Sequence, residues 1–514
     1  MALLTLPNEI LLQIWDELGI ESDFPYADQA SLLRVCRQSY NLFMPVLYKK
    51  FKVGMRGLAT IQSFTQLILR NQDIASSVQK VSVECWGFGK TSTEILGMNP
   101  VLIRERLGTL CLPPNEELPW MVALFLGQDD AWLAILLLHL PNLRSLRMKT
   151  CHLPDDTCTY SDRAAQGIAA QRIPLNSLQH LTNLDINLAH NPHLPWFLSN
   201  AFPWVRLPSM RRLRVTSAMD SYDERDLVIP PIGPSGVTHI KIDSSNCINT
   251  LASLITSCET LKSFKYDHQD GLVRHPVIYT TSDREWTSTE VHNYKLWRRR
   301  QGILDPSLFY SALFNRRSTL QTLWITLASD SWRYPSLHST RECPAQILGS
   351  LREFKALTQL RIRLQNLLEF PDGDVGRTPV TSLLDTLPDS IEYVFIQECA
   401  RPSLPMLIDE LQPLAAAGNS HLPHLRQLVI QQPSHEQDRL TYSHPTGQLY
   451  DPREVMEAMD GNRKAEVDIE LHVYRGLMYL RKALEDMGVD FVVLDKSDWR
   501  LKFLDTWPDR GVYW

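Results

Sequence analysis

The sequence predicts an α/β protein in which three short N-terminal helices precede an irregular solenoid of helix–strand units with a parallel, curved sheet. Two observations lead to this prediction. The first fifty residues carry apolar residues at helical spacing, and the rest of the chain repeats one short apolar pattern ten times.

Composition limits the classes of protein that fit. Hydrophobic residues make up 44% and charged residues 21% of the 514, as in globular chains. A net charge of −6 gives no general case for nucleic-acid or membrane partners, and neither is expected. The nine cysteines form no CxxC pair, which favours reduced thiols and an intracellular location, in the cytoplasm, the nucleus or both. We expect no secretion signal, and we interpret the apolar run 131–140 as a buried helix, too short to span a membrane.

The first expected helix begins at Leu6 in the stretch LPNEILLQIWDEL. Pro7 suits a first helical turn, and Glu9 lies near the positive end of the helix dipole. At 100° per residue the apolar side chains cover roughly 240° of the circumference, whereas docking on one domain needs only about 100°. This helix is therefore expected either to be buried on all sides or to reserve one face for another protein. The apolar positions are Leu6, Ile10, Leu11, Leu12, Ile14, Trp15 and Leu18.

Two further helices are expected before residue 52. One starts near Asp28, a plausible N-cap, and the other starts at Pro45 and ends near Phe51. Three helices in about fifty residues make too small a core for much independent stability. They are expected to lean on another structure. Their apolar residues are Leu32, Leu33, Val35, Cys36 and Tyr40, and then Val46, Leu47, Tyr48 and Phe51.

Residues 1–51 resemble an F-box, the adaptor-binding motif of Skp–cullin–F-box (SCF) ubiquitin ligases. The resemblance lies in the Leu6-Pro7-x-Glu9-Ile10 start, the Leu32-Leu33-x-Val35-Cys36-Arg37 segment and the closing Leu47-Tyr48. Ser39 departs from it, because an F-box often has an aromatic residue there, and Tyr40 is its neighbour. The resemblance implies contact with a Skp-type adaptor, and through it a cullin. The implied adaptor-binding residues are Leu6, Pro7, Ile10, Leu11, Ile14, Leu33, Val35 and Cys36. The alternative is a helical cap that only covers the end of the next domain.

After Phe51 the chain repeats an apolar residue, a second one three positions later and a third two positions after that. The last two positions alternate with polar residues, as in a short strand with one buried face. The pattern occurs at Val78-Val81-Val83, Leu143-Leu146-Met148, Leu181-Leu184-Ile186, Met210-Leu213-Val215, Val237-Ile240-Ile242, Leu261-Phe264-Tyr266, Leu320-Leu323-Ile325, Leu357-Leu360-Ile362, Ile391-Val394-Ile396 and Leu425-Leu428-Ile430. Helices are expected at 64–69, 132–140, 251–255, 308–314, 347–354 and 407–414, and a last helix at 474–487 precedes a strand at 491–494.

This Leu-x-x-Leu-x-Leu core resembles the leucine-rich repeat, and with the F-box it resembles fungal-type F-box proteins with degenerate repeats. Regular repeats carry Asn or Cys eight positions after the first Leu, where it satisfies buried backbone groups, and here only Cys151 and Cys399 fit. We therefore expect an irregular horseshoe with long loops over about 52–514, including an aromatic-rich insert at about 268–304. The rival interpretation is an open, doubly wound α/β domain. It would need a Gly-rich strand-to-helix turn, which these units lack.

The sequence holds no motif for catalysis. It has no GxGxxG, P-loop or HExxH, and no GxSxG at a suitable junction, so we expect neither an enzyme nor a cofactor. Cys151, His152 and Cys158 are close enough to suggest a metal site, but zinc would want a fourth ligand and usually a tighter pair of cysteines. A buried repeat cysteine followed by a loop is the favoured interpretation, and no metal site is predicted.

The concave side of the predicted sheet is the candidate substrate surface. The side chains expected there include nine Lys or Arg against four Asp or Glu, and three aromatics expected to be exposed, Trp324, Tyr393 and Phe395. We hypothesise that this face binds an acidic or phosphorylated protein segment through Arg pairs. The alternative is an ordinary solvated face whose charge leans positive, and the insert is a second candidate surface. The candidate substrate-binding residues are Arg147, Arg212, Arg214, Lys241, Lys265, Trp324, Arg361, Arg363 and Phe395.

These expectations combine into one predicted function. The chain would be a non-catalytic substrate-recognition subunit of an SCF-type ligase, with its F-box on the adaptor and its repeats on a protein substrate. The competing hypothesis is a leucine-rich-repeat scaffold whose N-terminal helices are only a cap.

Overall fold

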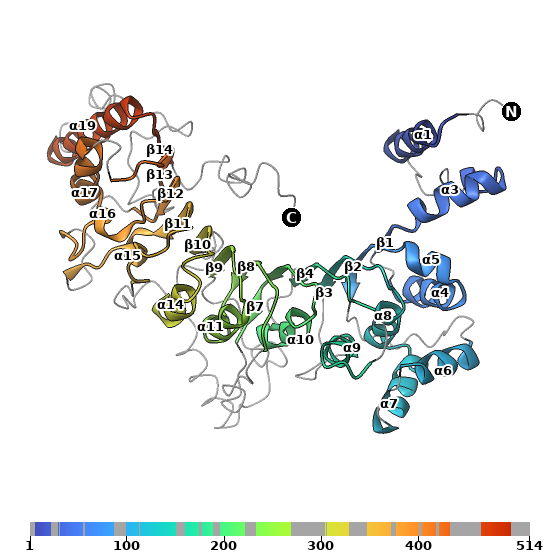
Figure 1. The fold of residues 1–514 in the computed structure, drawn as a ribbon. Coiled ribbons are helices and arrows are strands. Elements are labelled where there is room, and N and C mark those ends of the chain that lie inside the picture. Colours follow the sequence, from blue (N-terminus) through green and yellow to red (C-terminus); the bar gives the residue numbers. More distant parts are fainter. Residues whose placement is uncertain are drawn as a thin grey trace. The chain divides into compact units, whose positions relative to one another are not determined.

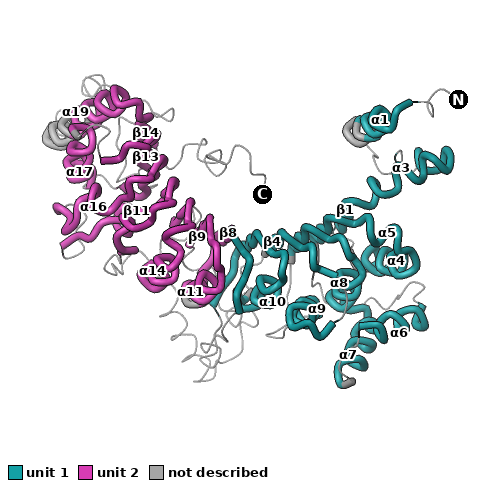
Figure 2. Tube along the Cα trace, viewed as in Figure 1, with its two compact units in different colours: residues 1–221, 228–238, 273–281 teal, residues 222–227, 239–272, 282–514 magenta. Residues whose placement is uncertain are grey.

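The computed structural model describes residues 6–21, 29, 31–54, 57–86, 99–110, 112, 114–150, 160–173, 177–188, 196–220, 233–268, 304, 306–327, 347–371, 377–399, 403–417, 421–431 and 464–494. These residues form two compact units, one up to residue 238 and one from residue 239 onward (Figure 2). Each unit is built on a parallel sheet whose strands follow one another in chain order, with helices along one face (Figure 1).

Unit 1 begins with the N-terminal helical segment and continues as strand–helix repeats. The helices are α1 (Asn8–Glu21), α3 (Arg37–Leu47), α4 (Gly57–Arg70), α5 (Gln72–Ser77), α6 (Pro100–Gly108), α7 (Pro114–Phe125), α8 (Asp129–Leu138), α9 (Tyr160–Ala169), the 3-10 turn η2 (Leu198–Ala201) and α10 (Phe202–Val205). The main sheet has the order β1 (Lys50–Val53), β2 (Lys80–Trp86), β3 (Ser145–Thr150), β4 (Asn183–Leu188) and β6 (Arg212–Thr216). A small separate sheet pairs β5 (Trp196–Phe197) with β7 (Ala218–Met219).

Unit 2 continues the same design. Its sheet has the order β8 (His239–Ser245), β9 (Ser263–His268), β10 (Thr322–Leu327), β11 (Gln359–Arg363), β12 (Tyr393–Gln397), β13 (Gln427–Gln431) and β14 (Asp490–Leu494). Its helices are α11 (Ile248–Ser257), α14 (Ser307–Phe314), α15 (Leu364–Leu367), α16 (Leu383–Thr386), α17 (Leu404–Ala417) and α19 (Lys464–Asp486).

The ten predicted repeat strands and the predicted last strand are confirmed. The β3 repeat illustrates the arrangement that the units share. Leu143 is buried in the turn before β3, and Leu146 and Met148 point from β3 toward the helices. A carbonyl just before a strand joins neighbouring repeats: the Arg144 oxygen, before β3, accepts N–H bonds from both Thr182 (2.9 Å) and Asn183 (3.1 Å). Burying the repeated apolar triplet and pairing these backbone groups is what stacks the units.

In three repeats a left-handed residue occupies the same repeat position, in the last residues of the strand or directly after it. Ser217, Ser244 and Glu398 have φ values of 63°, 47° and 57°. The next residue in each case is buried. At Cys399 the thiol donates a hydrogen bond to the Ile396 carbonyl at 3.6 Å. The Cys399 backbone N–H donates to the Gln431 carbonyl at 3.0 Å. The expected role of the repeat cysteine, pairing backbone groups at a strand end, is therefore confirmed at Cys399; Cys151 lies outside the described residues.

Six of the seven expected helical segments lie on observed helices: α4, α8, α11, α14, α17 and α19. The prediction of a helix at 347–354 is wrong, because this segment is irregular. Leu348, Leu351 and Phe354 are nevertheless buried, so the apolar spacing reflected packing and not a helix. Gly349 has a φ of +120°, outside the helical region, and its backbone passes close beneath the Tyr310 ring.

The run 131–140 is confirmed as buried, because every residue of 131–138 in α8 is inaccessible to solvent. Among the described residues, no single helix is long and apolar enough to cross a membrane. One bent pair, Asn115–Phe125 with Asp129–Leu138, meets the length and composition criteria together, with an angle of 117° between the two helices.

The N-terminal segment differs from the sequence prediction in its boundaries. The helix expected near Asp28 is present, because residue 29 and residues 31–33 are helical, but it ends before Val35. A separate helix begins at Arg37, and Pro45 lies inside it instead of starting a third helix. Phe51 lies in strand β1, which pairs in parallel with β2 from Lys50↔Lys80 to Val53↔Val83. The Phe51 ring stacks on Phe64 of α4, with 3.6 Å between ring centroids. The repeat sheet therefore starts at Lys50, directly after the helical segment.

Candidate functional site

The N-terminal helices have a small hydrophobic core of their own. Leu11 and Trp15 of α1 and Phe43 of α3 are buried together, and the Trp15 and Phe43 rings stack with 4.9 Å between centroids. Partly buried residues surround this core: Leu6, Leu12, Leu32, Leu33, Leu42, Val46 and Leu47. The apolar arc of α1 thus divides into a side that packs on α3 and a side that does not.

The eight predicted adaptor-binding residues fall into three groups by exposure. Leu11 is buried in the core and supports the segment's own fold. Ile10 and Val35 are exposed at 39% and 58%, and Pro7 is also exposed. The others are partly buried: Leu6, Ile14, Leu33 and Cys36. A partner could therefore reach Pro7, Ile10 and Val35 without unfolding the segment.

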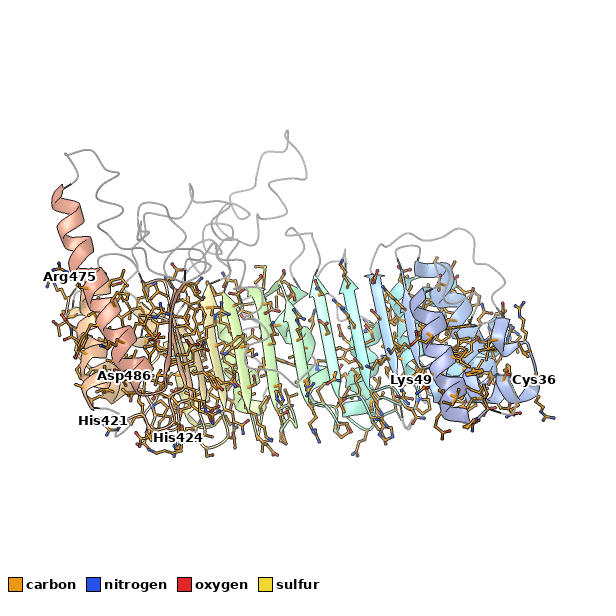
Figure 3. All side chains as sticks on the ribbon, turned by 90° about the horizontal axis from the view of Figure 1, so that it is seen from above. Cys36, Lys49, His421, His424, Arg475 and Asp486 are labelled. Carbon is orange, nitrogen blue, oxygen red and sulfur yellow. The ribbon has the colours of Figure 1, made fainter. Side chains whose placement is uncertain are left out.

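Cys36 also has a structural role, because it caps α3. The Ser39 N–H donates to the Cys36 sulfur at 3.3 Å, and the Ser39 hydroxyl lies 3.3 Å from the same sulfur. These bonds lower the pKa of the Cys36 thiol. Ser39 is buried and Tyr40 is exposed, so the small side chain suits the cap while the neighbouring ring remains at the surface. Figure 3 labels Cys36, just before α3, and Lys49, just after it.

The predicted substrate-binding residues of unit 1 lie on the sheet face turned away from the helices, called here the concave face. Arg147, Asp185 and Arg214 occupy directly paired positions on β3, β4 and β6. Arg147 Nε lies 3.3 Å from a carboxylate oxygen of Asp185. Arg212 and Arg214 are partly buried on this face. The structure therefore brings Arg147, Arg212 and Arg214 together on neighbouring strands.

In unit 2 the predicted residues form a row of alternating cations and aromatic rings. Lys265, Trp324, Arg361 and Phe395 are directly paired from β9 to β12, and Lys241 of β8 precedes them. Lys265 Nζ lies 3.6 Å from the Trp324 ring centroid, and the Arg361 guanidinium lies 5.5 Å from Trp324 and 4.7 Å from Phe395. Lys265 and Arg361 thus lie over aromatic faces, which stabilise their charges within the protein.

The expectation that Trp324 and Phe395 are exposed is wrong. Trp324 is 6% exposed, Phe395 is fully buried, and Lys265 is only 4% exposed. Phe395 packs with Val429, Val492 and Leu494, so this end of the concave face has its own apolar cluster. Strand alternation gives the face on which a side chain lies, but not whether other parts of the chain cover that face.

Comparison with known families agrees with this architecture. A leucine-rich repeat domain family matches residues 97–444, about two thirds of the chain. The chain belongs to the leucine-rich repeat family. The match begins after the N-terminal helices and does not include them. No curated protein matches this leucine-rich repeat chain. Leucine-rich repeat domains are generally non-enzymatic interaction modules, so the repeat domain is typical of a protein-interaction scaffold.

Two surface cations of the repeat domain escaped the sequence prediction. Lys50 and Lys52 lie on β1, exposed on the concave face beside β2. The prediction missed them because it placed 45–51 in a helix. The alternation of Lys50, Phe51, Lys52 and Val53 is a two-residue period, the signal that could have indicated a strand.

Two candidate sites of the repeat domain cannot be placed. Cys151, His152 and Cys158 lie outside the described residues, as does nearly all of the 268–304 insert. Among the residues that the structure describes, no three His, Cys, Asp or Glu side chains are grouped to hold a metal ion.

Proposed function

We propose that this leucine-rich repeat protein is the substrate-recognition subunit of an SCF-type ubiquitin ligase. The F-box-like segment, with α1 and α3, would bind a Skp-type adaptor, and through it a cullin, inside the cell. The repeat domain would hold a protein substrate. The repeat family supports the substrate-holding part of this proposal, because leucine-rich repeat domains are typical of protein-interaction scaffolds.

One observation supports the adaptor-binding role more than any other. The N-terminal helices close a core of their own yet leave Ile10 and Val35 exposed, and both belong to the F-box-like pattern. Tyr40, exposed at 42%, adds a third apolar side chain on α3. A helical cap would need its apolar side chains against the domain that it covers, whereas an adaptor-binding segment needs them at the surface.

The mechanism of such a receptor is tethering. The receptor breaks no bond itself; it holds a substrate at a fixed spacing from the catalytic machinery. This raises the effective concentration of the substrate at that machinery, to about millimolar for short flexible links.

The test is capture of a purified Skp-type adaptor by the full-length chain. The double variant Ile10→Asp/Val35→Asp places charges at two exposed apolar positions and should lose capture by about tenfold or more. The matched control is Gln13→Asp/Gln38→Asp, which puts the same charges at two exposed polar positions of the same segment. Equal capture by both variants would reject the adaptor role and leave a repeat scaffold with an N-terminal cap.

A further inference from the structure

The positive charge of the concave face is unevenly distributed between the two units. On β1, β2 and β3 of unit 1 it presents five cations, Lys50, Lys52, Lys80, Arg147 and Lys149, against one carboxylate, Glu84. On the sheet of unit 2 the cations and carboxylates are nearly balanced. They are Lys241, Lys265, Arg361 and Arg363 against Asp243, Asp267 and Asp490.

The five cations on β1–β3 form one cluster. Lys52 Nζ makes an ion pair of 2.7 Å with Glu84, and the charges of Lys52, Lys149 and Arg147 all help to lower the pKa of the Glu84 carboxyl. Arg147 also contacts Asp185 on β4 at 3.3 Å. Glu84 and Asp185 thus offset only part of the cluster's charge.

The pair Lys50 and Lys80 indicates most directly that this cluster binds an anion. They are exposed and directly opposite each other on paired strands, where like charges destabilise a sheet. Lysines on the edge strand β1 would be explained by protection against aggregation, but Lys80 lies on the second strand and Arg147 and Lys149 on the third. An external anion would relieve the repulsion.

We propose that an acidic segment of a partner protein, rich in carboxylate or phosphoserine, docks on this β1–β3 cluster of the concave face. Neighbouring strands are about 4.8 Å apart, so the cluster is about 10 Å wide, which suits a peptide crossing the strands. A nucleic acid fits less well, because its many phosphates need a basic stripe longer than the three strands of this cluster. The proposal rests on the proposed substrate-holding role of the repeats and names the chemistry of what they hold.

Fluorescence anisotropy on the full-length chain tests this. The probes are a fluorescein-labelled peptide of alternating Glu and Ser and the same peptide with phosphoserine. Lys50→Glu/Lys80→Glu should weaken binding of the better probe by about tenfold or more, because charge-assisted hydrogen bonds are lost. Lys50→Gln/Lys80→Gln, which adds no repulsion and should fold at least as well, should weaken it in the same direction. The matched control, Arg104→Glu/Arg172→Glu, reverses two exposed charges of unit 1 away from the sheet and should bind as the wild type does.

Several results would overturn the proposal: no binding of either peptide, equal binding by all variants, or tighter binding of poly(dT) or phosphatidylserine vesicles than of both peptides. Adaptor capture, measured on the same variants, separates this proposal from the proposed function. If the wild type binds the peptide but not the adaptor, the ligase role fails and the acidic docking surface stands.

Discussion

Trp15→Ala is the most informative change in the N-terminal segment. Trp15 is 3% exposed and stacks on Phe43, and together with Leu11 these rings are the buried part of the core shared by α1 and α3. Removing a buried Trp costs about 3–5 kcal/mol. A core this small rarely supplies more than about 3–5 kcal/mol in total. The substitution should therefore unfold α1 and α3 while the repeat sheets stay folded.

Hydrogen exchange measured by mass spectrometry on the full-length chain follows both parts at once. In Trp15→Ala the amides of α1 and α3 should exchange rapidly, whereas those of β3 and β9 keep their protection. Gln13→Ala, an exposed position on the same helix, is the control and should change neither region. If α1 stays protected, the core argument is refuted; if β3 also loses protection, the segment is not an independent unit and folds with the repeats.

Two further changes test the interiors of the two units. Burial raises the pKa of Asp130 to about 7, although this carboxylate accepts bonds from the Tyr160 and Ser161 N–H groups at the start of α9. Because the pKa of Asp130 is higher in the folded state than the ordinary 3.8, the folded state is favoured most when this carboxyl is protonated, below about pH 4. The free energy of unfolding should fall as the pH rises through 7. For this partly exposed group the fall should be about 1–3 kcal/mol. In urea unfolding, the free energy of unfolding of Asp130→Asn should decrease less between pH 4 and pH 7 than that of the wild type. An equal decrease in both proteins would contradict this. Trp324→Leu removes the ring beneath Lys265 and should cost about 2–4 kcal/mol in the same assay, whereas Gln321→Ala, an exposed neighbour, should cost little.

The candidate surfaces could be predicted only in part. The repeat pattern correctly placed Arg147, Arg214, Lys265 and Arg361 on one face of the strands, because alternation along a strand is a local property. It could not indicate that Trp324 and Phe395 are buried, because that depends on segments distant in the sequence. The division of charge between the units also required the strand pairing, which adds Lys50 and Lys52 beside Lys80.

The repeat architecture is encoded locally, in the spacing of apolar residues along the chain. Each Leu-x-x-Leu-x-Leu triplet forms a turn followed by a strand, as its spacing predicts. Leu143, Leu146 and Met148, for example, are all buried. Where the local pattern is ambiguous, contacts with distant segments set the conformation. Phe51 joins a strand because β2 and Phe64 lie beside it, and 347–354 is irregular although its apolar spacing suits a helix. Short segments gain too little free energy from their own hydrogen bonds and intrinsic propensity to fix a conformation, so the neighbours on which they pack determine it.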